Sequence, residues 1–341
     1  MSERNDLAAE YRDALVAYVK APDEAGRAHA YELGNRAVRE QVGLLELLAV
    51  HRSVVDGFPG DPDMRSLVVA ALDFLTESMS TFEMAQSGYR EAHERAAIAH
   101  DIALTLQRSL LPTDLPDTPG LELAVRYLPA GPDVEVGGDW YDLVPLGGDR
   151  VALVVGDVMG HGIQQAAAMG QVRLGLRAYM LEHHTIEEVV QRTDVLLQSI
   201  GETQTATLVL GVIDLAGPSL SLVNAGHPMP VLLDPAGSAT FVTGGHGRLL
   251  GLQESDPRPV LGPLAVTPGS SLLLYTDGLI ERHERAGGDG FVHLLETLDG
   301  FSGSPDELCD RVTETMVDDE PGDDVCLLAV RVAAPPDAHG R

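Results

Sequence analysis

Hydrophobic side chains in the first part of the chain recur every three to four residues, which is the spacing of amphipathic helices. The first series runs from Leu7 to Tyr18, and Pro22 ends it. Three further series follow, at about 24–41, 44–57 and 62–86. Four amphipathic helices joined by short turns predict a small helical bundle, and we assign residues 1–86 to it as one domain.

A charged helical segment follows at 89–111, and its apolar stripe is narrow. The stripe consists of Tyr89, Ala92, Ala96, Ala99, Ile102 or Ala103, Leu106 and Leu110. A narrow stripe is typical of a coiled-coil seam, whereas the face of a globular helix is wider. A homodimer through the N-terminal domain and this helix is therefore one interpretation, and a single solvated helix is the other. The segment PTDLPDTPG ends the helix, so we assign the linker to 87–114.

The pattern changes to strand-like runs from about residue 121. These runs are LELAVRYL, DWYDLVPL, RVALVVGDV, TATLVLGVIDL, SLSLVNAG, PVLLD, SLLLYTDG and DVCLLAVRV. Helical patterns separate some of them, at about 163–182, 185–200, 289–299 and 304–318. Strands in succession with inserted helix pairs favour layered sheets and helices, an α+β fold, over an alternating parallel order. We assign 115–333 to this second domain and 334–341 to a frayed tail.

The charge balance is strongly acidic. The chain has 23 basic and 52 acidic residues, which gives a formal net charge of −29. Such a surface repels nucleic acid and anionic membranes, so we expect neither as a partner. A phosphorylated substrate would be repelled as well, unless cations are bound close to it.

The sequence also bears on the compartment. It contains no run of about 18 apolar residues, and its first residues lack the apolar stretch of a secretory signal. We therefore expect a cytoplasmic protein. Cys309 and Cys326 do not have a zinc-binding spacing, and we expect both to be buried thiols.

Acidic residues with one shared local pattern are the candidate chemistry. They are Asp139 in GGDWYD, Asp157 in GDVMGHG, Asp277 in YTDG, and Asp323 with Asp324 in GDDVCLL. Each site falls at the end of a predicted strand and has a glycine neighbour, which allows close approach of backbone and ligand. Carboxylates are hard oxygen ligands that suit Mg²⁺ or Mn²⁺, whereas zinc prefers His or Cys. Two such ions about 4 Å apart can activate water for in-line attack on phosphorus. The alternative is a set of ordinary turn aspartates.

These motifs, together with NAGHP at 224–228, occur in the order found in one known family. Over about 121–332 the chain resembles bacterial PPM (type 2C-like) phosphatases of the RsbU and SpoIIE type. The resemblance implies an αββα sandwich with a two-metal centre at one end. It also implies Mn²⁺ or Mg²⁺ as the cofactor, as two ions with room for a third.

The resemblance further implies a role for each acidic residue. Asp157 matches the catalytic aspartate that bridges both metals, and the backbone carbonyl of Val158 matches a ligand of one of them. Asp277 and Asp323 resemble the remaining ligands of the other ion. Asp139 matches the acidic residue near the second or third metal site, and Asp324 is a weaker candidate at the neighbouring position.

Other matched positions have less certain roles. His161 or His227 could protonate the leaving serine oxygen as a general acid, or each could be structural in its loop. Asn224 is expected to brace its own loop, and Cys326 replaces the usual Thr or Ser. Eukaryotic relatives hold phosphate with an arginine. No motif fixes a counterpart here, and Arg126 and Arg248 are the candidates.

The N-terminal part resembles the RsbU subgroup. The segments 47–62 and 72–85 are similar to the helical N-terminal domain of RsbU, and LQRSLLP at 106–112 matches the end of its linker. In that subgroup the N-terminal domain binds a switch kinase of the RsbT type. Binding orders the linker into a dimeric coiled coil, which rearranges the first two helices of the phosphatase domain. Here those helices are predicted at about 163–182 and 185–200.

Together these features predict a phosphatase for phosphoserine or phosphothreonine. The expected substrate is a phosphorylated STAS-domain anti-anti-sigma factor in a partner-switching stress response. One alternative is a non-catalytic scaffold that binds a phosphoprotein, although every expected aspartate is present. Another is a phosphatase whose N-terminal bundle binds a different regulator.

Overall fold

The computed structural model describes residues 2–40, 42–57, 63–131, 136–182, 184–201, 204–252, 259–285, 289–317 and 321–333. Contacts between residues divide the chain into two compact units, Met1–Ile98 and Ala99–Arg341. The point of division lies within one helix. The predicted tail at 334–341 lies outside the described residues.

The first unit is built from four helices. They are α1 (Ser2–Lys20), α2 (Glu24–Arg39), α3 (Leu44–Val55) and the first part of α4 (Met64–Leu110). Tyr11 and Phe74 are fully buried in its core, and their rings meet edge to face with centroids 5.3 Å apart. Asp23 caps α2 by accepting a hydrogen bond from Gly26 N at 2.7 Å. The prediction of a helical bundle is confirmed.

Helix α4 covers the range in which the sequence predicted two helices, 62–86 and 89–111. No proline interrupts this range, and Gly88 is the single glycine between the two predicted helices. One interior glycine costs a helix only about 1 kcal/mol, which its neighbours offset. In the predicted stripe, the side chains of Tyr89, Ala92 and Ala96 lie outside the described part.

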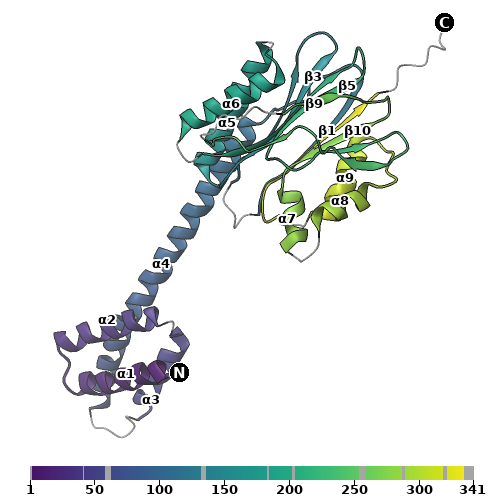
Figure 1. The fold of residues 1–341 in the computed structure, drawn as a ribbon. Coiled ribbons are helices and arrows are strands. Elements are labelled where there is room, and N and C mark those ends of the chain that lie inside the picture. Colours follow the sequence, from purple (N-terminus) through teal and green to yellow (C-terminus); the bar gives the residue numbers. More distant parts are fainter. Residues whose placement is uncertain are drawn as a thin grey trace. The chain divides into compact units, whose positions relative to one another are not determined.

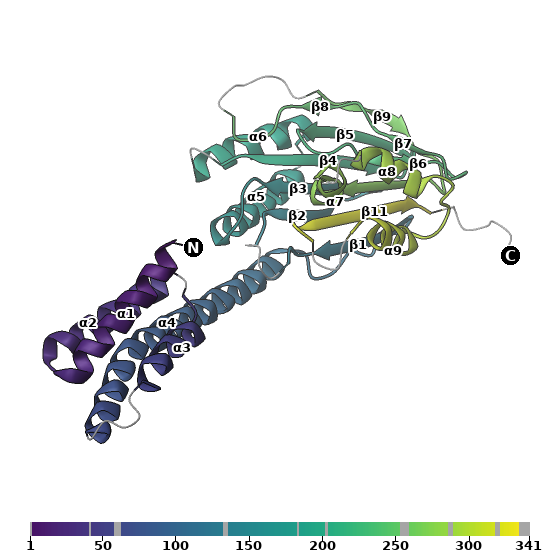
Figure 2. The same ribbon diagram turned by 90° about the horizontal axis from the view of Figure 1, so that it is seen from below.

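Two stacked sheets form the centre of the second unit (Figures 1 and 2). The six-stranded sheet consists of β2 (Asp139–Pro145), β3 (Arg150–Val158), β4 (Ala206–Asp214), β5 (Ser219–Ala225) and β8 (His246–Gly247) in that order, with β9 (Leu261–Ala265) also paired to β5. The five-stranded sheet has the order β1 (Leu121–Leu128), β11 (Val325–Val332), β10 (Ser271–Tyr275), β6 (Val231–Leu233) and β7 (Ala239–Phe241).

Helices cover the outer face of each sheet. Helices α5 (Ile163–Leu181) and α6 (Ile186–Ile200) pack on the six-stranded sheet. Helices α7 (Gly278–Arg285), α8 (Gly290–Leu298) and α9 (Pro305–Met316) pack on the five-stranded sheet (Figure 1). This is the predicted αββα sandwich.

The alternation of side chains along β11 shows how the layers are joined. Cys326 and Leu328 belong to the core between the two sheets, whereas Leu327 and Ala329 belong to the core beneath α8 and α9. A strand with period-2 side chains that are apolar on both faces must be covered on both. Cys309 and Cys326 are both buried free thiols, as expected.

Four short elements were not predicted from the sequence. Strands β7, β8 and β9 have two to five residues, too few to show a clear period. Helix α7 is highly charged, and its burial depends on Leu279 and Ile280. Within the described ranges, no helix is long and apolar enough to cross a bilayer.

Candidate metal centre

Asp139 and Asp157 lie opposite each other on adjacent strands. In the antiparallel pairing of β2 with β3, Asp139 is the register partner of Asp157. Directly opposed residues place their side chains on the same face with Cβ atoms about 5 Å apart. The first residue of β2 and the end of β3 thus present two carboxylates at one end of the sandwich.

The five-stranded sheet contributes acidic residues to the same place. Asp277 follows β10, and Asp323 and Asp324 precede β11, the antiparallel neighbour of β10. The negative charges of Asp277, Asp323 and Asp324 all act on Asp157. The predicted carboxylates, far apart in the sequence, therefore gather where the ends of both sheets meet.

Two glycines allow this approach. A Cβ atom on Gly138 would overlap the carbonyl oxygen of Val158, and a Cβ on Gly278 would overlap the carbonyl oxygen of Asp324. Backbone thus lies against backbone on both sides of the cluster. The close approach of backbone explains why glycine stands next to Asp139 and Asp277.

The carboxylates raise one another's pKa. Burial, followed by the charges of Asp277 and Asp323, raises the pKa of Asp157 to about 7. Burial, followed by Glu281 and Asp323, raises the pKa of Asp277 to about 6. Burial and the charge of Asp157 raise the pKa of Asp139 well above its usual range. Among the described residues, no positive side chain is a main influence on the pKa of these three carboxylates, and divalent cations would supply positive charge.

The donor set fits Mg²⁺ or Mn²⁺. All its side chains offer carboxylate oxygens, and Oδ2 of Asp139 is buried and accepts no hydrogen bond from the described residues. Among the described residues, no three Asp, Glu, His or Cys side chains form a ready-made coordination shell. The protein therefore offers part of a shell, and Mg²⁺ in particular usually keeps several water ligands.

Asp324 differs from the other acidic residues because protein donors surround its carboxylate. Its Oδ2 accepts hydrogen bonds from Tyr127 Oη at 2.6 Å and from Gln107 Nε2 at 2.5 Å. Its Oδ1 accepts one from Ala130 N at 2.8 Å, and the residue is 1% exposed. Both lone pairs of Oδ2 are thus in use, which favours a supporting role over direct metal binding. The adjacent Asp323 is exposed, and its Oδ1 accepts the Asp324 N–H at 2.8 Å.

His227 is part of the framework beneath the cluster. Its Nε2 donates to the carbonyl of Tyr275 at 3.0 Å, so its Nδ1 accepts the Thr207 hydroxyl at 2.8 Å. Thr207 is the register partner of Asp157 on β4. Burial lowers the pKa of His227 to about 3, which keeps the ring neutral. Both ring nitrogens are engaged, so His227 braces the two sheets.

Asn224 braces the loop that contains His227. Its Nδ2 donates to the carbonyl of His227 at 2.9 Å, and its Oδ1 accepts the His227 N–H at 2.8 Å. His161 has a different setting, because it is exposed in the loop between β3 and α5. Its neighbours Gly160 and Gly162 have φ of 97° and 105°, values that favour glycine.

The two arginine candidates for phosphate binding lie elsewhere. Arg126 on β1 pairs with Asp306 and Asp310 of α9, with nitrogen–oxygen distances of 3.2 and 2.7 Å. Its guanidinium is therefore occupied on the outer face of the five-stranded sheet. Arg248 follows β8, at the opposite edge of the six-stranded sheet from β2.

Sequence reasoning missed the residues that hold Asp324. Gln107 lies in the helical segment whose stripe was considered for dimerisation, and Tyr127 lies in β1. The available signal for Gln107 was a polar residue at helical spacing within an apolar stripe, four residues after Ala103 and three before Leu110. Its partner cannot be identified without the fold.

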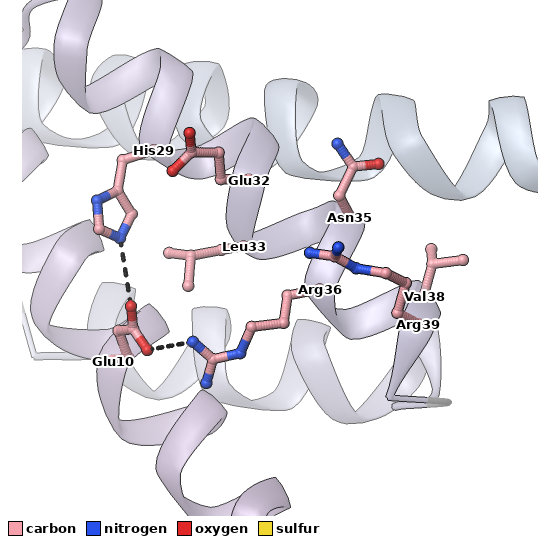
Figure 3. A pocket seen from close by; sticks show the side chains of 8 residues that line it. All are labelled: Glu10, His29, Glu32, Leu33, Asn35, Arg36, Val38 and Arg39. Atoms are coloured by element: carbon pink, nitrogen blue, oxygen red, sulfur yellow. Dashed lines mark hydrogen bonds and ion pairs between the residues drawn. The ribbon is translucent and has the colours of Figure 1, made fainter.

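The first unit contains a cavity whose lining differs from the acidic cluster of the second unit. A cavity of about 480 Å³ is lined by Glu10, His29, Glu32, Leu33, Asn35, Arg36, Val38 and Arg39. Figure 3 shows the carboxylate of Glu10 between His29 and Arg36, with Arg36 Nη1 at 2.6 Å and His29 Nε2 at 3.7 Å. These charges offset one another, and the cavity has no group of carboxylates like that of the second unit.

A family model decides the identity of the second unit. The model described as Stage II sporulation protein E (SpoIIE) matches residues 147–333, more than half of the chain. The chain belongs to the SpoIIE family. A second model, for the N-terminal domain of the phosphoserine phosphatase RsbU, matches residues 9–85 of this SpoIIE-family chain. The SpoIIE family is part of the PP2C (PPM) phosphatases, whose members generally use Mn²⁺ or Mg²⁺.

Solved structures also resemble this SpoIIE-family chain. The RsbU and RsbW domains of Rv1364c from Mycobacterium tuberculosis are 34% identical, with a TM-score of 0.57 over 65% of this chain and 64% of that one. The PP2C domain of SpoIIE from Bacillus subtilis, with a regulatory fragment, is 18% identical and shares the fold, with a TM-score of 0.56 over 63% of this chain and 64% of that one.

Two curated relatives of this SpoIIE-family chain are longer proteins. Protein IcfG of Synechocystis is 27% identical over 66% of this chain and 40% of its own length. Phosphoserine phosphatase RsbP of Bacillus subtilis is 28% identical over 43% of this chain and 37% of its own length. The chain thus matches about two-fifths of the length of these relatives.

Proposed function

We propose that this chain is a Mn²⁺- or Mg²⁺-dependent protein serine/threonine phosphatase. The observation that carries the proposal is the meeting of carboxylates from both sheets around Asp157. Asp157, the Val158 carbonyl, Asp277 and Asp323 would hold two ions, with Asp139 at the second or at a third. When bound, the ions would activate a water molecule for attack on phosphorus and offset the charge of the phosphate.

The remaining residues organise this site. His227 and the Thr207 hydroxyl hold β4 against the end of β10, which fixes Asp157 relative to Asp277. His161 is exposed in the loop that follows Val158, where it can donate a proton to the leaving serine oxygen. The bound cations would attract the phosphorylated substrate despite the net charge of −29.

The substrate that we propose is a phosphorylated STAS-domain protein in a partner-switching stress response. The match of residues 9–85 to the N-terminal domain of RsbU supports this assignment. The resemblance to RsbP, named a phosphoserine phosphatase, supports it as well. By the same likeness, a switch kinase of the RsbT type would bind the first unit and activate the enzyme.

We also propose that α4 forms a dimer with a second copy of the chain. Ile102 of the predicted stripe is 57% exposed, and Ile98, which lies one helical turn before it and outside that stripe, is 61% exposed. Ala103, the alternative to Ile102 in the stripe, instead packs with Val136 and Ala166. Burying these side chains in a coiled-coil seam would stabilise a dimer. Sedimentation of the full chain, compared with an Ile98→Glu, Ile102→Glu variant, tests this assignment.

Phosphatase activity is tested with p-nitrophenyl phosphate and with a phosphorylated STAS-domain protein, in the presence and absence of Mn²⁺. We expect turnover with Mn²⁺ and loss of turnover in Asp157→Asn. The control is Asp149→Asn, which alters an exposed acid in the turn between the same two strands. Binding of the phosphoprotein without hydrolysis would instead identify a scaffold.

A further inference from the structure

Gln107 lies near the end of α4 and is fully buried beside the acidic cluster. Its Nε2 is 2.6 Å from Tyr127 Oη, 3.1 Å from the carbonyl oxygen of Gly137 and 2.5 Å from Asp324 Oδ2. A carbonyl and a carboxylate can only accept hydrogen bonds, so the NH₂ group of the amide must face them. The orientation of the side chain is therefore fixed by its partners.

These partners belong to both halves of the candidate metal centre. Gly137 leads through Gly138 into Asp139, the first residue of β2 in the six-stranded sheet. Asp324 follows Asp323 and precedes β11 of the five-stranded sheet. One amide group thus ties together the two acidic loops, which come from different sheets.

Tyr127 completes the network. Its hydroxyl lies 2.6 Å from Asp324 Oδ2 and 3.3 Å from the carbonyl oxygen of Asp139. A phenol has one proton and the amide NH₂ group has two, so three protons serve the contacts among Gln107, Tyr127, the Gly137 carbonyl and Asp324 Oδ2. Gln107 and Tyr127 together supply the donors to Asp324 Oδ2.

The last turns of α4 also contact α5, the helix that follows the candidate ligand Val158. Ala103 packs with Val136 and with Ala166 of α5. Leu110 lies so close to Gly170 of α5 that a Cβ there would be 2.9 Å from it. Helix α5 begins at Ile163, after a short loop that directly follows Val158, the last residue of β3. The end of α4 therefore contacts or adjoins the segments that carry the candidate ligands Asp139, Val158 and Asp323.

The burial of Gln107 has a cost that packing does not explain. Its Oε1 is buried and has no hydrogen-bond partner among the described residues. A buried acceptor left unpaired destabilises a fold, and an apolar side chain of similar size would avoid this cost. The amide is thus better explained by what its Nε2 holds than by the stability of the helix.

We propose that Gln107 is a positioning residue through which the end of α4 sets the metal affinity of the acidic centre. It does so by holding Asp324 and the Gly137 carbonyl, and hence the spacing between the loops of Asp139 and Asp323. This inference rests on the proposed function, because it concerns the affinity of that same site. A shift or rotation of α4 that withdraws the amide would loosen both loops together.

The test compares Gln107→Met with the full wild-type chain. Methionine keeps the length of the side chain and removes the donor. Ser109→Ala is the matched control, because Ser109 is exposed near the end of the same helix and bonds to Leu106 of its own turn. Isothermal titration with Mn²⁺ gives the Kd without substrate, and p-nitrophenyl phosphate gives kcat at saturating Mn²⁺.

We expect Gln107→Met to raise the Kd for Mn²⁺ by about tenfold, as the loss of a hydrogen bond to a charged group predicts. The kcat at saturating Mn²⁺ should change much less, and Ser109→Ala should match the wild type. If Gln107→Met does not fold, Tyr127→Phe removes the other donor to Asp324 and should weaken Mn²⁺ binding in the same direction. A purely structural role would lower the melting temperature without this separation of Kd from kcat.

Two results would overturn the inference in distinguishable ways. A wild-type chain that hydrolyses phosphate with Mn²⁺, together with variants of unchanged Kd, would contradict the role of Gln107 alone. A wild-type chain that neither binds Mn²⁺ nor hydrolyses phosphate would remove the proposed function and this inference with it.

Discussion

Asp139 stands directly opposite Asp157 across the β2–β3 pair, and Asp139 is only 3% exposed. Asp157 is half-buried, and two carboxylates at this separation repel each other unless a cation or a proton lies between them. The same cluster receives Asp277 and Asp323 from the other sheet. The metal-free centre is therefore under electrostatic strain, which metal binding would relieve.

Replacing Asp157 with Asn should separate stability from metal binding. The substitution removes one charge from the repelling cluster, so the metal-free protein should melt at the same temperature or higher. The upward shift of melting temperature that Mn²⁺ causes in the wild type should disappear. Thermal melting with EDTA and with excess Mn²⁺ measures both effects. Asp149→Asn should behave as the wild type, and a retained Mn²⁺ shift in Asp157→Asn would argue against Asp157 as a ligand.

The stability of the metal-free protein should fall as the pH rises. The pKa values of Asp157 and Asp277 are raised from 3.8 to about 7 and about 6. The folded chain thus binds more protons than the unfolded chain, and this contribution is full below about pH 4 and lost as the pH passes through 6 and 7. Melting in EDTA between pH 5 and 8 tests this direction. Mn²⁺ competes with these protons, so its affinity should rise over the same range.

A methyl group on Gly278 should disturb the centre. A Cβ at this position would overlap the carbonyl oxygen of Asp324, so Gly278→Ala must move the loop that contains Asp323. We expect a loss of about 1–3 kcal/mol in the free energy of unfolding and weaker Mn²⁺ binding. Denaturant unfolding and Mn²⁺ titration measure these effects. Gly217→Ala is the control, because nothing lies within 4 Å of a Cβ there. Equal Mn²⁺ affinity in the two variants would count against this account of the site.

Substitution of His161 and of His227 should have different effects on the enzyme. If His161 protonates the serine oxygen, His161→Gln should lower kcat for a phosphoserine substrate by about 100-fold. Hydrolysis of p-nitrophenyl phosphate should change little, because p-nitrophenolate leaves without a proton. His227→Gln should instead lower stability and leave the shape of the pH–rate profile unchanged, since its ring is neutral and buried. A missing limb of that profile in His227→Gln would identify His227 as the acid.

The acidic residues could be predicted because each adjoins a strand with a clear apolar pattern. Asp157 ends such a run, and Asp323 and Asp324 begin another. Strand order could not be predicted, so the register of Asp139 with Asp157 had to come from the structure. The bond from Gln107 to Asp324 spans 217 positions in the sequence, and no local pattern points to it. Helix α7 was missed because charged side chains dominate its short sequence.

The most direct measurement of the central claim is anomalous diffraction at the manganese edge from crystals grown with Mn²⁺. The account predicts two peaks about 4 Å apart, with Asp157 between them and Asp277, Asp323 and the Val158 carbonyl among the ligands. Peaks elsewhere in the molecule, or no peak at this end of the sandwich, would contradict it.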